Sequence, residues 1–202
     1  MRTENFNQTL YIYEAFKLRW VRIANPNLVL LVRATTLLAL GALFSMTDIA
    51  SATEISSPLT GQWQVAETAD EKNERMQTIN EATGHLADFQ QVKARDRLSE
   101  RTSPPQSLLI EIKGEKVSIA SGNGRLDLEL EGPPIEVSGR AGKAQISAKM
   151  QDSLLIVLAR SSGGERTTVY RASGDRLIVE VTLTGARLAK SLKYVSSYVR
   201  TQ

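Results

Sequence analysis

Residues 154–184, LLIVLARSSGGERTTVYRASGDRLIVEVTLT, hold three runs of strand-forming side chains separated by two turns. In the second and third runs, side chains alternate at period two, which is typical of a strand with one buried face. Gly163-Gly164 and Gly174-Asp175 are residue types that tight turns favour. The first run, residues 154–159, is apolar on both faces, so we expect a central strand covered on both sides. The stretch therefore predicts three consecutive antiparallel strands.

The same rhythm extends to both sides of this stretch. Short alternating runs recur from residue 107 to residue 200, separated by glycine or proline clusters at residues 122–124, 132–134 and 139–142. Turns at intervals of about 8–12 residues predict an antiparallel meander over about 107–200. A meander leaves two open edges unless it curls. We therefore expect a mainly β fold in which about 8–10 strands form a barrel or half-barrel.

One strand and a helical insert precede the meander. Residues 59–65, LTGQWQV, alternate as a short strand, and we expect its Trp63 to be buried as a structural residue. Thr68 and Glu71 have the spacing of a helix capping box. Apolar side chains then recur at helical spacing up to the region before Pro104-Pro105. The pattern predicts two short helices over about 68–101, which cover one mouth or one open face of the barrel.

The helical insert carries an apolar stripe that has to be buried, because an exposed stripe of this size would favour aggregation. The stripe consists of Met76, Ile79, Leu86, Phe89 and Val92. We expect it to pack across a barrel mouth, with Phe89 reaching toward the barrel axis. Leu86, Phe89 and Val92 would then form a lid over the interior. Packing on an outer face would give the helices a purely structural role.

The first 52 residues have the features of an export signal. Arg33 precedes an apolar core at residues 34–44, and Ala50-Ser51-Ala52 fits the site that signal peptidase reads. As a helix the core would rise about 16 Å, too short for a hydrocarbon layer of about 30 Å. We expect cleavage after Ala52, leaving residues 53–202 as a single β domain that is periplasmic or secreted. An uncleaved inner-membrane anchor over residues 28–44 and a cytoplasmic amphipathic segment remain the alternatives.

Composition excludes several classes of function. The chain has 202 residues, no cysteine and one histidine, which excludes disulfide scaffolds, cysteine zinc sites and multi-histidine metal sites. Residues 53–202 carry 20 basic and 19 acidic side chains, so the domain lacks the concentrated basic surface that nucleic acid requires. We expect no nucleic-acid partner, no metal and no cofactor. Contact with a membrane is expected only through an uncleaved leader or weakly through the somewhat basic run at residues 93–101.

Few residues carry a pattern that points to catalysis, and we name no catalytic residue. His85 follows Gly84 between the two helices, with Asp88 placed to orient it, but the position is typical of a solvated residue at a helix start. Another pattern is a row of carboxylates, which a cation could bind. We expect this row to pair across strands with Lys143 and Lys149 instead. The row consists of Asp127, Glu129 and Glu131.

The start of the domain resembles the G-x-W opening of lipocalin-like barrels, on the residues Gly61-Gln62-Trp63. The resemblance implies that the tryptophan plugs the closed end of a barrel and that a late arginine, Arg200 or Arg187, stacks on it. The sequence departs from lipocalins by placing its helices after the first strand. It also resembles uncharacterised secreted bacterial proteins with one small β domain, in its tryptophan-bearing first strand, its helical stretch, and the segments at residues 169–177 and 188–194.

Three functions follow from these patterns. The first is an exported, non-enzymatic barrel that binds a small apolar ligand or lipid inside. The second is an envelope structural or protein-interaction domain with a solid core, and the third is an enzyme of unknown class. An interior cavity would favour the first function over the second. Strand alternation names the residues that would line the ligand site or fill the core: Ile110, Val117, Leu128, Ile146, Val157, Val179 and Tyr194.

Overall fold

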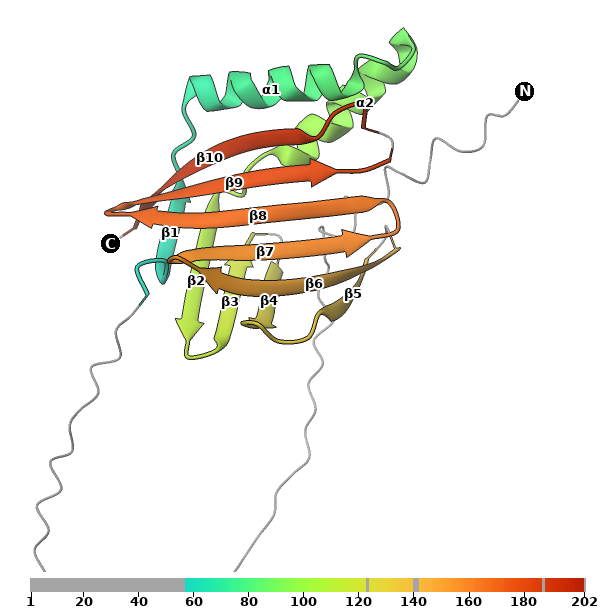
Figure 1. Cartoon of the computed structure of the whole chain (residues 1–202). Helices are drawn as coiled ribbons and strands as arrows, with labels where there is room; N and C mark the ends of the chain where they lie inside the picture. Colours follow the sequence, from blue (N-terminus) through green and yellow to red (C-terminus); the bar gives the residue numbers. More distant parts are fainter. Residues whose placement is uncertain (1–56, 123, 140–141, 187, 202) are drawn as a thin grey trace, which may run out of the picture. The chain divides into compact units, whose positions relative to one another are not determined.

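The computed structural model describes residues 57–122, 124–139, 142–186 and 188–201, in which ten strands form one antiparallel sheet and two helices follow the first strand (Figure 1). Strand order is β4-β3-β2-β1-β10-β9-β8-β7-β6-β5, a meander that confirms the predicted fold. The elements are β1 (Gly61–Val65), α1 (Ala69–Thr83), α2 (Asp88–Thr102), β2 (Ser107–Lys113), β3 (Lys116–Ser121), β4 (Gly124–Glu129), β5 (Ile135–Gly139), β6 (Gly142–Gln151), β7 (Leu154–Ser161), β8 (Gly164–Ser173), β9 (Arg176–Thr184) and β10 (Leu192–Arg200).

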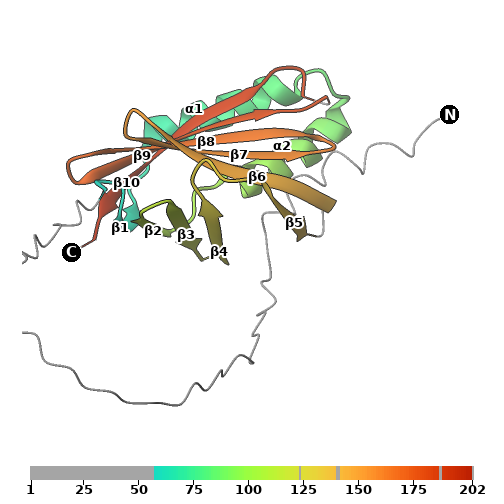
Figure 2. The same ribbon diagram turned by 60° about the horizontal axis from the view of Figure 1, so that its bottom comes forward.

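The sheet curls into a nearly closed barrel. β1 pairs with both β2 and β10, so the first strand joins the two halves of the meander. β4 and β5 end the sheet (Figure 2). Between these ends, a single parallel bridge joins Leu130 to Ala148, and the amide of Glu131 donates to the Ala148 carbonyl at 2.9 Å. One contact point therefore closes the barrel where a full strand ladder is missing.

One face of every long strand fills the barrel interior. On β7, Leu155, Val157 and Ala159 are buried, and on β9 the alternate residues from Leu177 to Leu183 are buried as well. The prediction that residues 154–159 are covered on both sides is wrong, because Ile156 and its outward neighbours are only half-buried. A barrel has a single inner face, so a strand that is apolar on both sides leaves its second apolar row on the outer wall.

The first helix begins at the cap that the sequence predicts. Thr68 caps α1 in a full capping box, in which its hydroxyl accepts from the Glu71 amide at 3.2 Å and its own amide donates to the Glu71 carboxylate at 2.8 Å. β1 pairs with only the last residues of β10, and α1 packs beside the remainder of that strand (Figure 1). There the Ala66 amide donates to the Ser197 carbonyl at 2.8 Å. The helical pair thus covers an open stretch of the barrel wall.

The predicted burial of the whole helical stripe is wrong for its second half. Ile79 is buried and Met76 and Leu86 are half-buried, but Phe89 is 76% exposed and Val92 is 59% exposed. α2 turns a different face inward, formed by Ala94, Leu98 and Thr102. These three residues recur at i, i+4 and i+8, whereas the run from Leu86 to Val92 crosses the start of α2 at Asp88. A stripe drawn across that break does not continue on one helical face.

Charged residues of the strands pair differently from the prediction. β4 and β6 share no strand ladder beyond the bridge between Leu130 and Ala148, and the ion pairs of this region are formed with other partners. Arg125 pairs with Asp127 at 2.8 Å, and Lys143 pairs with Glu136 at 2.7 Å. The described ranges contain no cluster of three or more metal-ligating side chains, and none of their helices is long and apolar enough to cross a membrane. The leader and its cleavage site lie outside these ranges.

A candidate ligand cavity inside the barrel

The barrel holds a partly open cavity of about 220 Å³. Its apolar wall comes from β2, β3, β4, β6, β7 and β9, and its polar wall comes mainly from β8 and β10. One side is bounded by residues 100–105, where α2 ends and the chain turns into β2. The apolar lining consists of Leu108, Ile119, Leu126, Ile146, Val157, Ala159, Val179 and Val181, and the polar lining from the strands consists of Ser121, Arg125, Arg166, Thr168, Tyr170, Tyr194, Ser196 and Tyr198.

Strand alternation brings the polar side chains together. Arg166, Thr168 and Tyr170 occupy successive inward positions on β8. Tyr194, Ser196 and Tyr198 do the same on β10, and β9 lies between these two strands with its apolar row facing inward. The cavity therefore has two polar rows on one side, and aliphatic side chains form much of the wall opposite them.

Arg166 is the cation that faces the buried phenols. Its Nε donates to the Thr168 hydroxyl at 3.2 Å. Burial raises the pKa of Tyr170, Tyr194 and Tyr198 above the ordinary phenol value, while the positive charge of Arg166 lowers it by a smaller amount. The three phenols therefore stay protonated at neutral pH and can act as hydrogen-bond donors inside the barrel.

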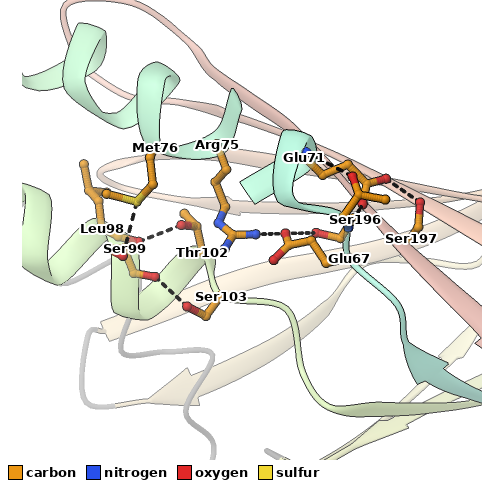
Figure 3. Close-up of polar contacts among 11 residues, drawn as sticks. Glu67, Glu71, Arg75, Met76, Leu98, Ser99, Thr102, Ser103, Ser196 and Ser197 are labelled. Atoms are coloured by element: carbon orange, nitrogen blue, oxygen red, sulfur yellow. Dashed lines mark hydrogen bonds and ion pairs between the residues drawn. The ribbon is translucent and has the colours of Figure 1, made fainter. Parts of the chain in front are cut away.

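A second polar network joins α1 and the segment before it to β10 (Figure 3). Arg75 forms an ion pair with Glu67, and the hydroxyl of Ser196 donates to the same Glu67 carboxylate at 3.5 Å. Ser197, on the outer face of β10, donates to Glu71. Burial lowers the pKa of Arg75. The network fixes the position of Ser196, whose side chain also lines the cavity.

The predicted lining residues fall into two groups. Ile146, Val157, Val179 and Tyr194 line the cavity. The other three residues are buried in the same apolar core but do not line it: Ile110, Val117 and Leu128. The predicted lid residues, Leu86, Phe89 and Val92, do not line the cavity either. Residues 100–105 bound it instead. Whether any of these residues contacts a ligand stays a prediction.

Sequence reasoning missed the polar row that β8 contributes to the cavity. Thr167, Val169 and Arg171 form the row that is visible in the sequence, but this row faces outward, and Arg166, Thr168 and Tyr170 face inward. The pairing of β8 with β7 decides which row of β8 faces inward, because inward-facing Val157 pairs with Thr168. Tyr170 was the available signal, since a large aromatic side chain favours the buried face.

Comparison with known proteins places the fold but no sequence family. No protein-family model matches the sequence, and no curated protein matches it. The resemblance to secreted bacterial β-domain proteins therefore stays a prediction.

Among solved structures, the secretary abundant heat soluble (SAHS) protein from Ramazzottius varieornatus is similar with a TM-score of 0.50 and 10% identity, covering 73% of this chain and 98% of that one. Human cRBP IV is similar with a TM-score of 0.47 and 15% identity, covering 71% of this chain and 98% of that one. Zebrafish ileal bile acid-binding protein, complexed with cholic acid, is similar with a TM-score of 0.44 and 15% identity, covering 72% of this chain and 100% of that one. Identities this low show a shared fold alone. The fold itself is a ten-stranded antiparallel meander that forms a nearly closed barrel, with two helices after its first strand.

Proposed function

We propose that the domain binds a small amphipathic molecule with an acidic head group inside the barrel, without catalysing a reaction on it. The observation that carries this proposal is Arg166 beside buried, protonated phenols at a cavity with aliphatic side chains on much of its wall. A ligand anion beside a guanidinium in a low-dielectric interior gains charge-assisted hydrogen bonds, which are among the strongest in proteins. The aliphatic wall is suited to the apolar body of the same ligand.

The size of the cavity limits the ligand. At about 220 Å³ it is smaller than the range of about 300–1,000 Å³ that is usual for ligand pockets. Each buried methylene contributes about 0.8 kcal/mol to transfer out of water, so a chain of several carbons would supply useful affinity within this volume. A short or medium-length carboxylic acid is the ligand class that fits both the size and the polarity.

Binding suits the site better than catalysis does. Ser196 is the lining hydroxyl that approaches a carboxylate, that of Glu67. Arg75 pairs with this carboxylate, and such a pairing makes it a weak base. A serine nucleophile requires a base that can take up its proton. The buried network therefore supports an architectural role for Ser196.

We propose further that the domain acts outside the cytoplasm, in the periplasm or secreted, after cleavage behind Ala52. The support is the sequence of the leader, with its apolar core at residues 34–44. N-terminal sequencing and intact mass of protein recovered from cell fractions test the proposal. A chain that begins at Thr53 in the soluble envelope fraction is expected. A full-length chain in the membrane fraction would indicate the anchored alternative.

Ligand binding is tested by displacement of the fluorescent dye anilinonaphthalene sulfonate, with protein purified from the cells that express and process it. Decanoate is expected to displace the dye at lower concentration than decanol does. Replacing Arg166 with Gln should weaken the binding of decanoate by about 10–100-fold, because a hydrogen bond to a charged group contributes about 1.5–3 kcal/mol. Decanol should be unaffected.

Arg160→Gln is the matched control, because Arg160 lies on the neighbouring strand with its side chain 67% exposed and pointing outward. It should leave the affinity for decanoate unchanged. Equal affinity for decanoate and decanol would remove the acidic head group from the proposal. Absence of both dye and decanoate binding would favour the envelope interaction domain instead.

A further inference from the structure

The outer wall of the barrel carries an apolar patch on β7, β8 and β9. Its five side chains point away from the interior and are half-buried by their strand neighbours. In the described part of the chain, α1 packs on β10 and on α2, so neither helix has its main contacts on this wall (Figure 1). We call these residues the outer patch: Leu154, Ile156, Leu158, Val169 and Ile178.

Strand register arranges charges symmetrically around the centre of the outer patch. Ile156 pairs with Val169 at the middle of the β7–β8 ladder. On the β6 side, the neighbour of Ile156 is Lys149, and on the β9 side the neighbour of Val169 is Glu180. From β6 to β9, one row of side chains across the wall therefore consists of a cation, two apolar side chains and an anion. A second row has the same order of charge, since Arg160 on β7 pairs with Glu165 on β8.

This order of charges is self-complementary under two-fold symmetry. A two-fold axis parallel to the strands, between β7 and β8, would place each β6 position opposite the β9 position of a second copy. Lys149 of one copy would then face Glu180 of the other, twice, around a centre in which Ile156 meets Val169. A homodimeric interface requires that one surface complement itself in this way. Lys149 and Glu180 are both exposed, and Glu180 also pairs with Arg171 of its own chain at 3.5 Å, a surface pair that contact with a second copy would have to share.

We propose that the outer patch is a homodimer interface, in which two barrels pack wall to wall along β7 and β8. Packed sheets lie about 10 Å apart, a distance that the aliphatic side chains of the patch can fill. A convex barrel wall offers limited area, so the interface falls at the lower end of the specific range, near 1,200 Å² in total.

Sedimentation equilibrium over a range of protein concentrations tests this proposal with the purified, processed protein. The unmodified chain should shift from monomer to dimer as concentration rises. Lys149→Glu and Glu180→Lys should each weaken dimerisation about tenfold or more, since each places like charges opposite one another. The double variant restores opposite charges across the interface and should recover most of the loss. Within one chain Lys149 and Glu180 are separated by two strands, so recovery reports contact between copies.

Two further variants separate this interface from other surfaces. Ile156→Lys should abolish dimerisation while the β-sheet circular dichroism spectrum and thermal melting of the barrel are retained. Phe89→Ser removes an exposed apolar side chain on α2 and should leave dimerisation unchanged. A chain that stays monomeric at all concentrations would overturn the proposal. So would a dimer that tolerates Ile156→Lys, or one that Phe89→Ser disrupts.

Discussion

Arg200 lies over Trp63, with the guanidinium carbon 4.2 Å from the centroid of the indole ring. The same guanidinium donates to the carbonyls of Thr60 at 2.7 Å and Pro58 at 2.6 Å, and the indole Nε1 donates to the Leu59 carbonyl at 3.0 Å. The last strand is thereby joined to the segment that leads into the first. This contact confirms the stacking role expected for Arg200; the other candidate, Arg187, lies outside the described residues.

Trp63→Ala should destabilise the domain severely. Trp63 is completely buried, and truncating a buried aromatic side chain costs about 3–5 kcal/mol. Because small domains are stable by about 5–15 kcal/mol, the variant should melt at much lower temperature or fail to fold. Urea unfolding, monitored by circular dichroism, measures the change, with Trp63→Phe as a milder comparison. Unchanged stability of Trp63→Ala would contradict the role of Trp63 in the core.

Gly61→Ala should cost stability because of Arg200. Gly61 has φ of +148°, which L side chains rarely adopt, and an added Cβ would lie 2.3 Å from the Arg200 Nη1. Arg200→Ala removes that clash along with a cation–π contact that contributes about 0.5–1 kcal/mol at an exposed site. The double variant should therefore be less destabilised than the sum of the two single variants. A double-mutant cycle by urea unfolding tests this coupling, and strict additivity would mean that Gly61 is required for its backbone conformation alone.

Local patterns in the sequence were sufficient for the fold. Alternation predicted the meander, Thr68 and Glu71 predicted the start of α1, and the resemblance to G-x-W barrels implied the stacking of a late arginine on Trp63. Each of these features depends on residues within one element or on a single well-defined pair.

Features that depend on register could not be predicted in the same way. The inward face of β8 is decided by its pairing with β7, and a shift of one residue would exchange Arg166 with Thr167. Similarly, the exposure of Phe89 depends on where α2 begins, at Asp88. The inward row of β8 and the exposed face of α2 were missed because strand parity and helix phase are fixed by tertiary contacts.

The cavity tyrosines should make the domain unstable in strong alkali. Burial raises the pKa of Tyr170, Tyr194 and Tyr198 in the folded state above the unfolded value of about 10. Above that pH the unfolded chain loses protons that the folded chain retains, so the free energy of unfolding falls as pH rises. Below pH 10 the contribution is constant. These are the three tyrosines of residues 53–202, so phenolate absorbance should rise together with unfolding. Titration near pH 10 in a chain that remains folded would show that the phenols contact solvent.

Two substitutions on α2 should separate its exposed face from its buried face. Phe89→Ala should change the free energy of unfolding by less than about 0.5 kcal/mol, as is usual for surface positions, and leave dye uptake unchanged. Leu98→Ala, on the buried face, should cost about 2–5 kcal/mol. Thermal melting and dye titration of both variants provide the comparison. Increased dye uptake in Phe89→Ala would restore the lid role that its exposure argues against.

Removing one partner of the ion pair between Arg75 and Glu67 should destabilise the domain strongly, whereas removing both charges should destabilise it much less. Only 5% of the Arg75 side chain and 12% of the Glu67 side chain are exposed. Arg75→Met would leave a buried, unpaired carboxylate, and breaking a buried pair in this way costs about 3–5 kcal/mol. Arg75→Met combined with Glu67→Gln removes both charges and should recover much of that loss. Urea unfolding at neutral pH measures both variants. Because protonation neutralises Glu67, the deficit of Arg75→Met relative to the unmodified chain should also shrink as pH falls. A deficit that is the same at all pH values would indicate that Arg75 contributes by packing rather than by charge.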